Sequence, residues 1–270
     1  MAYSYRARDG VEIPGYLTRP LDAKGPTPLV LLPHGGPAAR DVGGYDWLAH
    51  ALASRGYAVL QPNFRGSGGF GEKWEKAGHG EWGIGVMQND LTDGVAAVVA
   101  AGIADPERVC IVGASYGGYA ALAGAVFTPE LYRCAAAIAG VSDLRDMLGF
   151  ERDKAGQASA TLSYWRQAMG VTDADSPVER LNAASPAQHV ERVRAPILLI
   201  HGRDDTVVPI TQSRAMQRAL ANAGKRVQLV ELDGEDHWLS RPPTRLATLQ
   251  ALDRFLAEQL GHGAATVTQE

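Results

Sequence analysis

The sequence predicts an α/β fold built on a mostly parallel, doubly wound sheet. Six short apolar runs alternate with helix-like segments, and five of the six are near-continuous rather than alternating. Continuous apolar runs are expected of strands that helices cover on both faces, and the alternation of strand with helix indicates repeated βαβ units. The 270 residues suffice for one domain of this type without a disulfide or a metal to hold it.

The elements can be placed in chain order. Residues 3–20 predict a hairpin that turns at Asp9 and Gly10. Buried strands are expected in TPLVLLPHGG, YAVLQPNFRGSGG, RVCIVGAS, CAAAIAGVS, PILLIHGRDD and RVQLVELDG, with helices between them. Residues 144–190 are polar, lack a strand pattern and predict a helical insertion. The domain is expected to span residues 1–260, and residues 261–270 are expected to form a disordered tail.

Composition excludes several classes of partner. The formal net charge is −4 and the charges are interspersed, so no basic block predicts binding to nucleic acid or to an anionic membrane. No window of about 18 apolar residues could span a bilayer, and the N-terminus has no apolar signal core. Cys110 and Cys134 each lie in an apolar run and are interpreted as core thiols in a reducing compartment. The sequence therefore predicts a cytoplasmic protein.

The segment GASYG, residues 113–117, fits the pattern G-x-S-x-G. Its context is more informative than the pattern, because a strand-like run precedes Ser115 and a helix-like run follows it. A tight strand-to-helix turn strains the serine backbone and exposes its hydroxyl at the end of the sheet. Ser115 is therefore the candidate nucleophile, and Tyr116 offers a backbone N–H to an oxyanion. The alternative is a serine that only caps a helix.

A serine hydroxyl needs a general base that a third group orients. In the α/β-hydrolase arrangement the chain order is serine, then acid, then histidine. His237 follows the last apolar run and is the candidate base; the alternative is a solvated loop histidine. Asp204 and Asp205 both follow the preceding apolar run, and the pattern does not decide which of the two is the acid. In the loop PHGGP, Gly36 is the candidate for a second oxyanion N–H, and His34 is interpreted as structural.

Other charged groups are interpreted as structural. Arg65 is expected to form a buried ion pair that orders the loop NFRGS, rather than to bind substrate. Asp90 and Asp93 are expected to serve the start of a helix. No pair of histidines or cysteines has zinc spacing, so neither a metal nor an organic cofactor is expected.

Together these motifs resemble the catalytic domain of the prolyl oligopeptidase family of serine peptidases, and within it the acylaminoacyl-peptidase-like branch. The resembling pieces run from about residue 8 to residue 240: DGVEIPGYLTRP, HGGP, PNFRGSGGFGEKW, GIADPERVCIVGASYGGYAAL, APILLIHGRDDTVVP and GEDH. The resemblance implies that Ser115 is the nucleophile and His237 the base. In the family pattern H-G-x-x-D the acid comes four residues after the histidine, which implies Asp205.

The resemblance also implies how a substrate is held. The N–H groups of Tyr116 and Gly36 would bind the oxyanion. Three residues would line an apolar pocket for the acyl side chain, although each could equally belong to the core: Val141, Tyr164 and Val208. Two residues past the acid, where the family often has Arg or Asn to hold a substrate carbonyl, this chain has Val207. Family members carry a β-propeller before this domain and the chain has no room for one, so it is either a stand-alone hydrolase or a fragment.

The function predicted is hydrolysis of peptide or N-acyl-aminoacyl bonds in short peptides, through an acyl-enzyme on Ser115. A carboxylesterase acting on small esters is the alternative on the same residues, because fold and triad do not choose between amide and ester. An assembly or binding domain without catalysis is the alternative from another class. The expected partner is a short peptide or a small ester, and a homo-oligomer is compatible with the sequence.

Overall fold

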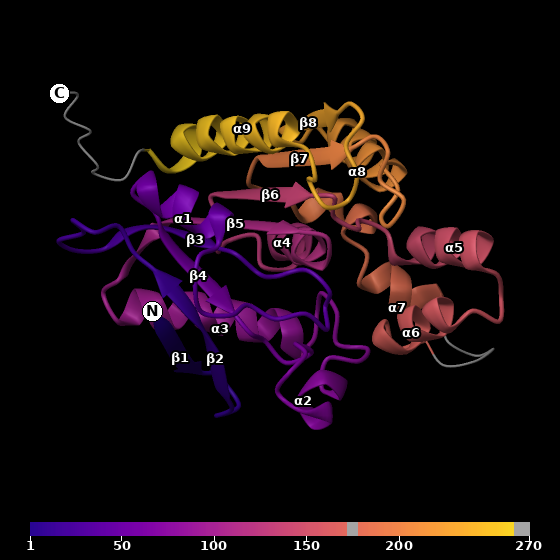
Figure 1. Cartoon of the computed structure of the whole chain (residues 1–270), viewed down its shortest axis with the longest axis horizontal. Coiled ribbons are helices and arrows are strands. Elements are labelled where there is room, and N and C mark those ends of the chain that lie inside the picture. The colour runs from indigo at the N-terminus through magenta and orange to yellow at the C-terminus, as the bar shows by residue number, and fades with distance from the viewer. Residues whose placement is uncertain (172–177, 262–270) are drawn as a thin grey trace.

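A computed structural model of the chain describes residues 1–171 and 178–261. Within them, eight strands form one sheet in the order β1-β2-β4-β3-β5-β6-β7-β8 (Figure 1). The strands are β1 Ala2–Arg6, β2 Glu12–Thr18, β3 Thr27–Leu31, β4 Ala58–Pro62, β5 Ala104–Ala114, β6 Cys134–Ile138, β7 Ile197–Gly202 and β8 Val227–Leu232. The pairings of β2 with β1 and β4 are antiparallel, and the remaining pairings are parallel. The predicted hairpin and the mostly parallel sheet are confirmed.

Helices cover both faces of the sheet, as the continuous apolar runs predicted. One core cluster joins α1 (Trp47–Ser54) and α9 (Pro242–Leu260) to strand residues such as Val30 and Ile200. The other joins α3 (Val86–Ala100), α4 (Tyr116–Phe127) and α8 (Thr211–Asn222) to Leu31 and Leu199. Adjacent residues of a strand point to opposite faces, so each strand contributes to both clusters.

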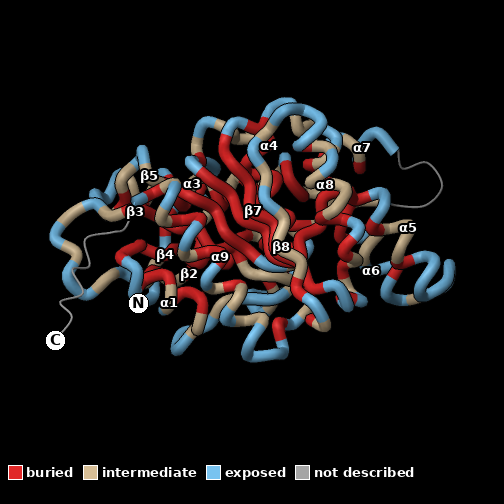
Figure 2. Tube along the Cα trace, turned by 90° about the horizontal axis from the view of Figure 1, so that it is seen from above, coloured by how far each residue is buried: buried red, intermediate tan, exposed pale blue. Residues whose placement is uncertain are grey.

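The strand β8 differs from the others because it forms an edge of the sheet. Its residues are mostly half-buried, and only Leu232 is fully buried. Figure 2 shows the same contrast, with buried residues concentrated in the central strands and intermediate ones along β8. Its sequence, VQLVEL, contains two polar residues, Gln228 and Glu231, so it is less apolar than the central strands, as expected for a strand at the edge of the sheet.

The segment between β6 and β7 carries the predicted helical insertion. It contains α5 Leu144–Ala155, α6 Ala160–Ala168, α7 Val178–Ala183 and two 3₁₀ turns, Pro186–Gln188 and Val190–Arg192. Figure 1 shows α5, α6 and α7 gathered at one end of the molecule, beyond the end of β6. A short helix, α2 (Glu72–Lys76), precedes α3. Of the predicted tail, only Gly261 belongs to the described residues. None of the described helices is both long enough and apolar enough to cross a membrane.

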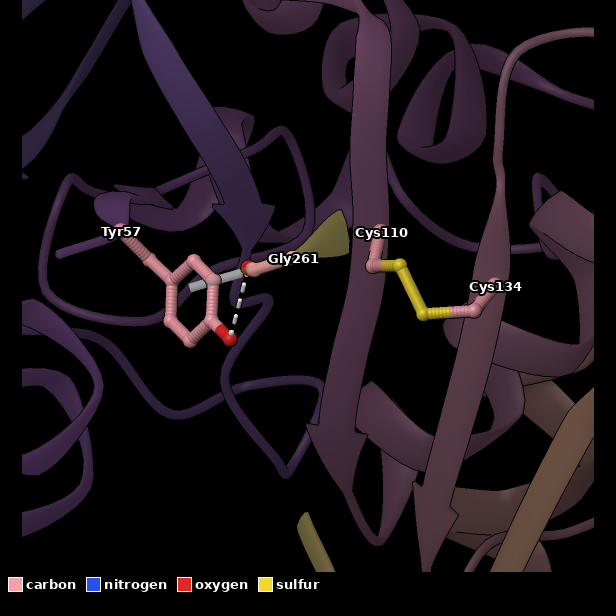
Figure 3. The surroundings of a disulfide bond; sticks show 4 residues. All are labelled: Tyr57, Cys110, Cys134 and Gly261. Atoms are coloured by element: carbon pink, nitrogen blue, oxygen red, sulfur yellow. Dashed lines mark hydrogen bonds between the residues drawn. A yellow bond between two sulfur atoms is a disulfide. The ribbon is translucent and has the colours of Figure 1, made fainter. Parts of the chain in front are cut away.

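The interpretation of both cysteines as core thiols is wrong, because the structure pairs them in a disulfide (Figure 3). Cys110 of β5 and Cys134 of β6 are direct partners in the parallel register, with their Cα atoms 4.8 Å apart. Neighbouring strands place paired residues within the reach of a disulfide. A buried disulfide is typical of oxidising compartments, so the argument for a reducing one loses its basis.

Figure 3 also shows the Tyr57 hydroxyl, which donates to the Gly261 carbonyl at the end of α9.

The loop after β4 is held by an ion pair, as predicted for Arg65. Its guanidinium and backbone N–H both donate to the carboxylate of Asp90, at 2.6–3.0 Å, and a further N–H donates to Asp9 in the hairpin turn. The role expected for Asp90 and Asp93 is wrong, because α3 begins at Val86 and both acids lie inside it. Their carboxylates instead join α3 to Arg65 and Arg8.

Candidate active site

Ser115 lies on a strained turn between β5 and α4. Its φ is +57° and its ψ is −119°, a conformation that costs a non-glycine residue about 1–3 kcal/mol. The chain crosses itself so closely here that a Cβ on Gly113 would overlap the carbonyl oxygen of Gly117, and a Cβ on Gly117 would overlap that of Pro33. The Ser115 N–H also donates to the Ile138 carbonyl at 2.9 Å. Packing thus fixes the turn and leaves Ser115 half-buried at the end of the sheet.

His237 and Asp205 meet across two loops at the same end of the sheet. His237 Nδ1 lies 2.7 Å from Asp205 Oδ2. The second oxygen, Oδ1, accepts the N–H groups of Val207 and Val208 at 2.8 and 2.9 Å. Burial alone would raise the pKa of Asp205, but the hydrogen bonds from His201, His237 and the backbone hold that pKa well below its usual range.

This charge state fixes the tautomer of His237. An ionised carboxylate can only accept, so the Nδ1 atom that faces Asp205 carries the proton. The other nitrogen of a neutral imidazole, Nε2, is then an acceptor, as a general base requires. Asp204 is exposed, and the structure brings Asp205 rather than Asp204 onto His237.

A second histidine supports the same carboxylate. His201 is fully buried, its Nδ1 lies 2.7 Å from Ser213 Oγ, and its Nε2 lies 2.9 Å from the Val208 carbonyl and 3.3 Å from Asp205 Oδ2. In the family pattern H-G-x-x-D, His201 serves only to locate the acid four residues later. From sequence alone, a histidine at the end of an apolar strand that contacts a carboxylate looks the same as one that is only buried in the core.

The loop that carries His237 is organised by Glu235, a residue that the sequence pattern does not single out. This side chain is fully buried. Its Oε1 accepts the N–H groups of Asp236 and Ser240, and its Oε2 accepts from the Thr244 hydroxyl at the start of α9. The motif GEDH contains two adjacent acids, Glu235 and Asp236, and nothing in the motif indicates which of them is buried.

Ser115 and His237 line one cleft of about 310 Å³. The loop after β3, the end of β5 and residues 237–239 form its walls. No hydrogen bond joins the Ser115 hydroxyl to His237, although both residues are within the described part of the chain. Such contacts are often long in a ligand-free site and tighten when substrate binds.

The two predicted oxyanion donors belong to two segments next to Ser115. Tyr116 is the first residue of α4, so its N–H has no acceptor within the helix. In the loop after β3, Gly35 packs against Ser115, and Gly36 follows with a φ of +116°. His34 has its Nε2 2.8 Å from Ser67 Oγ and its ring stacked on Phe64. Burial lowers the pKa of His34 to about 4, so it is neutral at neutral pH.

The structure does not bring the predicted acyl-pocket residues into this cleft. Val141 and Val208 are each 1% exposed and belong to the core cluster of α3, α4 and α8. Tyr164 lies on α6 and is 37% exposed. As for metals, no three His, Cys, Asp or Glu side chains are grouped to hold an ion anywhere in residues 1–171 or 178–261.

Known proteins match this chain in sequence and in architecture. The model of the prolyl oligopeptidase family matches residues 44–263, most of the chain. The chain belongs to the prolyl oligopeptidase family. Within this family, dipeptidyl aminopeptidase BIII of Pseudoxanthomonas mexicana is 36% identical, over 98% of this chain and 39% of that protein. The acylamino-acid-releasing enzyme of Arabidopsis thaliana is 30% identical, over 80% of this chain and 28% of that protein.

Solved structures of the family agree with the fold. A puromycin-hydrolyzing peptidase of Mycobacterium tuberculosis superposes with a TM-score of 0.87 at 28% identity, over 97% of this chain and 39% of that one. The α/β-hydrolase fold and the family resemblance predicted from the sequence are therefore confirmed. The chain spans about two fifths of the length of the first relatives it matches.

Proposed function

We propose that this chain is a serine peptidase unit that cleaves peptide or N-acyl-aminoacyl bonds in short peptides. The observation that carries the proposal is the 2.7 Å contact of His237 with Asp205, in a loop that shares one cleft with the strained Ser115. The names of the two relatives, an aminopeptidase and an acylamino-acid-releasing enzyme, favour the same peptide-bond hydrolysis.

The proposed reaction has two steps. Ser115 attacks the substrate carbonyl while Nε2 of His237 takes its proton. Asp205 holds the imidazole in the required tautomer and stabilises the imidazolium. The oxyanion accepts from the N–H groups of Tyr116 and Gly36. His237 returns the proton to the leaving amine, and water then hydrolyses the acyl-enzyme.

Peptidase and esterase activity are separated by one comparison on the purified protein. We expect measurable turnover of an N-acetyl-aminoacyl p-nitroanilide, recorded as kcat/KM beside that of a short-chain p-nitrophenyl ester. The ester alternative is kept because Val207 stands where the family often has a residue that holds a peptide carbonyl. Ester turnover with no anilide cleavage would contradict the peptidase proposal and support a carboxylesterase.

Replacing the acid tests the roles of the two aspartates. Asp205→Asn is expected to lower kcat by about 10⁴-fold, because an amide facing Nδ1 favours the wrong imidazole tautomer. Asp204→Asn is the matched control: it removes the same charge one residue away, from an exposed side chain, and is expected to leave kcat within about twofold. Both are read as kcat on the same ester or anilide. An equal reduction of kcat in the two variants would contradict the assignment of Asp205 as the residue that orients His237.

A further inference from the structure

The cleft beside Ser115 has an apolar body. Its walls include the side chains of Leu32, Trp47, Leu48, Ile138 and Leu239. All of these belong to or pack against the core cluster on the face of the sheet that α1 and α9 cover. The predicted acyl-pocket residues Val141 and Val208 belong to the cluster on the opposite face. The cleft therefore lies on the other side of Ser115 from those residues.

The position of the histidine indicates which part of a substrate would occupy this cleft. In serine acyl transfer, the histidine that takes the serine proton gives it to the leaving group, so the leaving group must lie beside that histidine. Here His237 and the two residues after it line the cleft together with Ser115. The cleft is thus placed to receive the residue that follows the scissile bond.

The lining of the cleft also includes two acids. Asp41 and Asp46, from the loop between β3 and α1, line it together with Gln61 of β4. The backbone N–H of Asp41 donates to Asn63 Oδ1 at 2.7 Å, and Gln61 Nε2 donates to Asp41 Oδ1 at 3.2 Å. Asp46 Oδ1 accepts the Ala49 N–H and so caps α1. These contacts hold the two carboxyl groups at fixed places.

The two acids lack a compensating charge. Asp41 Oδ2 is buried and has no hydrogen-bond partner. Among the described residues, no Lys, Arg or His nitrogen lies within salt-bridge distance of the carboxylate oxygens of Asp41 or Asp46. The one histidine that contacts Asp46 in this part of the chain, the exposed His50, does so through the Asp46 backbone. Burial, with a smaller contribution from Asp46, raises the pKa of Asp41 to about 7. A buried carboxyl of this kind is stabilised in its charged form by a nearby cation.

We propose that this cleft is the leaving-group subsite and that it selects a basic side chain, Lys or Arg, directly after the scissile bond. The aliphatic stem of such a side chain matches the apolar walls, and its charged end would contact the two acids that line the cleft. The inference rests on the proposed function, because it takes Ser115 as the nucleophile and His237 as the proton donor.

The subsite is tested by binding, without turnover. In the Ser115→Ala protein, calorimetry compares acetyl-Phe-Lys-amide with acetyl-Phe-norleucine-amide, which has a similar stem and no ammonium. The lysyl peptide is expected to bind about 10-fold more tightly, the size typical of a hydrogen bond to a charged group. Equal affinities, or no binding of the lysyl peptide, overturn the proposal.

Two further variants assign the preference to the acids. Asp41→Asn and Asp46→Asn, each made in the Ser115→Ala protein, are expected to reduce the preference for lysine; asparagine also caps helices, so α1 keeps its N-cap in the second variant. Asp22→Asn, an exposed acid before β3, is the control and is expected to keep the 10-fold preference. A preference that persists in both cleft variants overturns the assignment.

Failure of the subsite and failure of the proposed function give different results. Turnover of both peptides by the wild-type protein at equal kcat/KM would leave the peptidase proposal intact and remove the subsite. A lysine preference in binding, with no cleavage of either peptide by the wild type, would support the subsite and contradict the peptidase proposal.

Discussion

Replacing Ser115 with alanine is expected to lower kcat by about 10⁵–10⁶-fold, as removal of a nucleophile does in serine hydrolases. The fold should be unaffected, because the strained turn is set by the close crossing at Gly113 and Gly117 and by the N–H bond to Ile138, not by the serine hydroxyl. The two readouts are single-substrate kinetics and the Tm, which we expect to stay within about 2 °C of the wild type.

The control for this variant is Ser54→Ala. Ser54 is an exposed residue at the end of α1 whose hydroxyl donates only to the Ala51 carbonyl, so kcat should not change. Hydrolysis retained in Ser115→Ala at more than about 1% of the wild-type rate would remove Ser115 as nucleophile. A wild-type protein with no turnover of any ester or anilide would instead favour the alternative of a binding or assembly domain.

The sequence was informative wherever a pattern and its structural cause are local. Continuous apolar runs identify strands covered on both faces, and all six predicted runs are strands. The glycines around Ser115 indicate a close crossing of strand and helix, and the structure has that crossing. The order serine, acid, histidine could be read directly because parallel strands bring the loops at their carboxyl ends to one edge of the sheet.

Features that depend on spatial pairing were missed. Cys110 and Cys134 lie 24 residues apart, and their bond requires β5 and β6 to be neighbours in one particular register. Core thiols and a cross-strand disulfide give the same apolar sequence context. Asp41 could not be singled out either, because nothing in its local sequence distinguishes an ordinary loop acid from one that lines a cleft.

Removing Arg65 is expected to have the largest effect on stability. Its side chain is 11% exposed, and the carboxylate it binds, Asp90, is fully buried within α3. Arg65→Met would leave that carboxylate buried without a charged partner, with the backbone N–H of residue 65 still donating to it. The loss is expected to cost about 3–5 kcal/mol in the free energy of unfolding, measured with urea. Arg8→Met, which breaks the more exposed pair with Asp93 on the same helix, is the control and should cost under about 1 kcal/mol.

The pH dependence and a double variant separate loss of the ion pair from loss of packing. Burial raises the pKa of Asp90 even though Arg65 lowers it, so removing Arg65 should raise it further. A folded-state pKa above the unfolded value means that the folded protein takes up the proton more readily, so Arg65→Met should regain stability as the pH falls through that raised pKa. Adding Asp90→Asn should recover part of the loss at neutral pH, because it removes the unpaired charge. Additive costs in the double variant, with no gain at acidic pH, would mean that Arg65 acts through its packing alone.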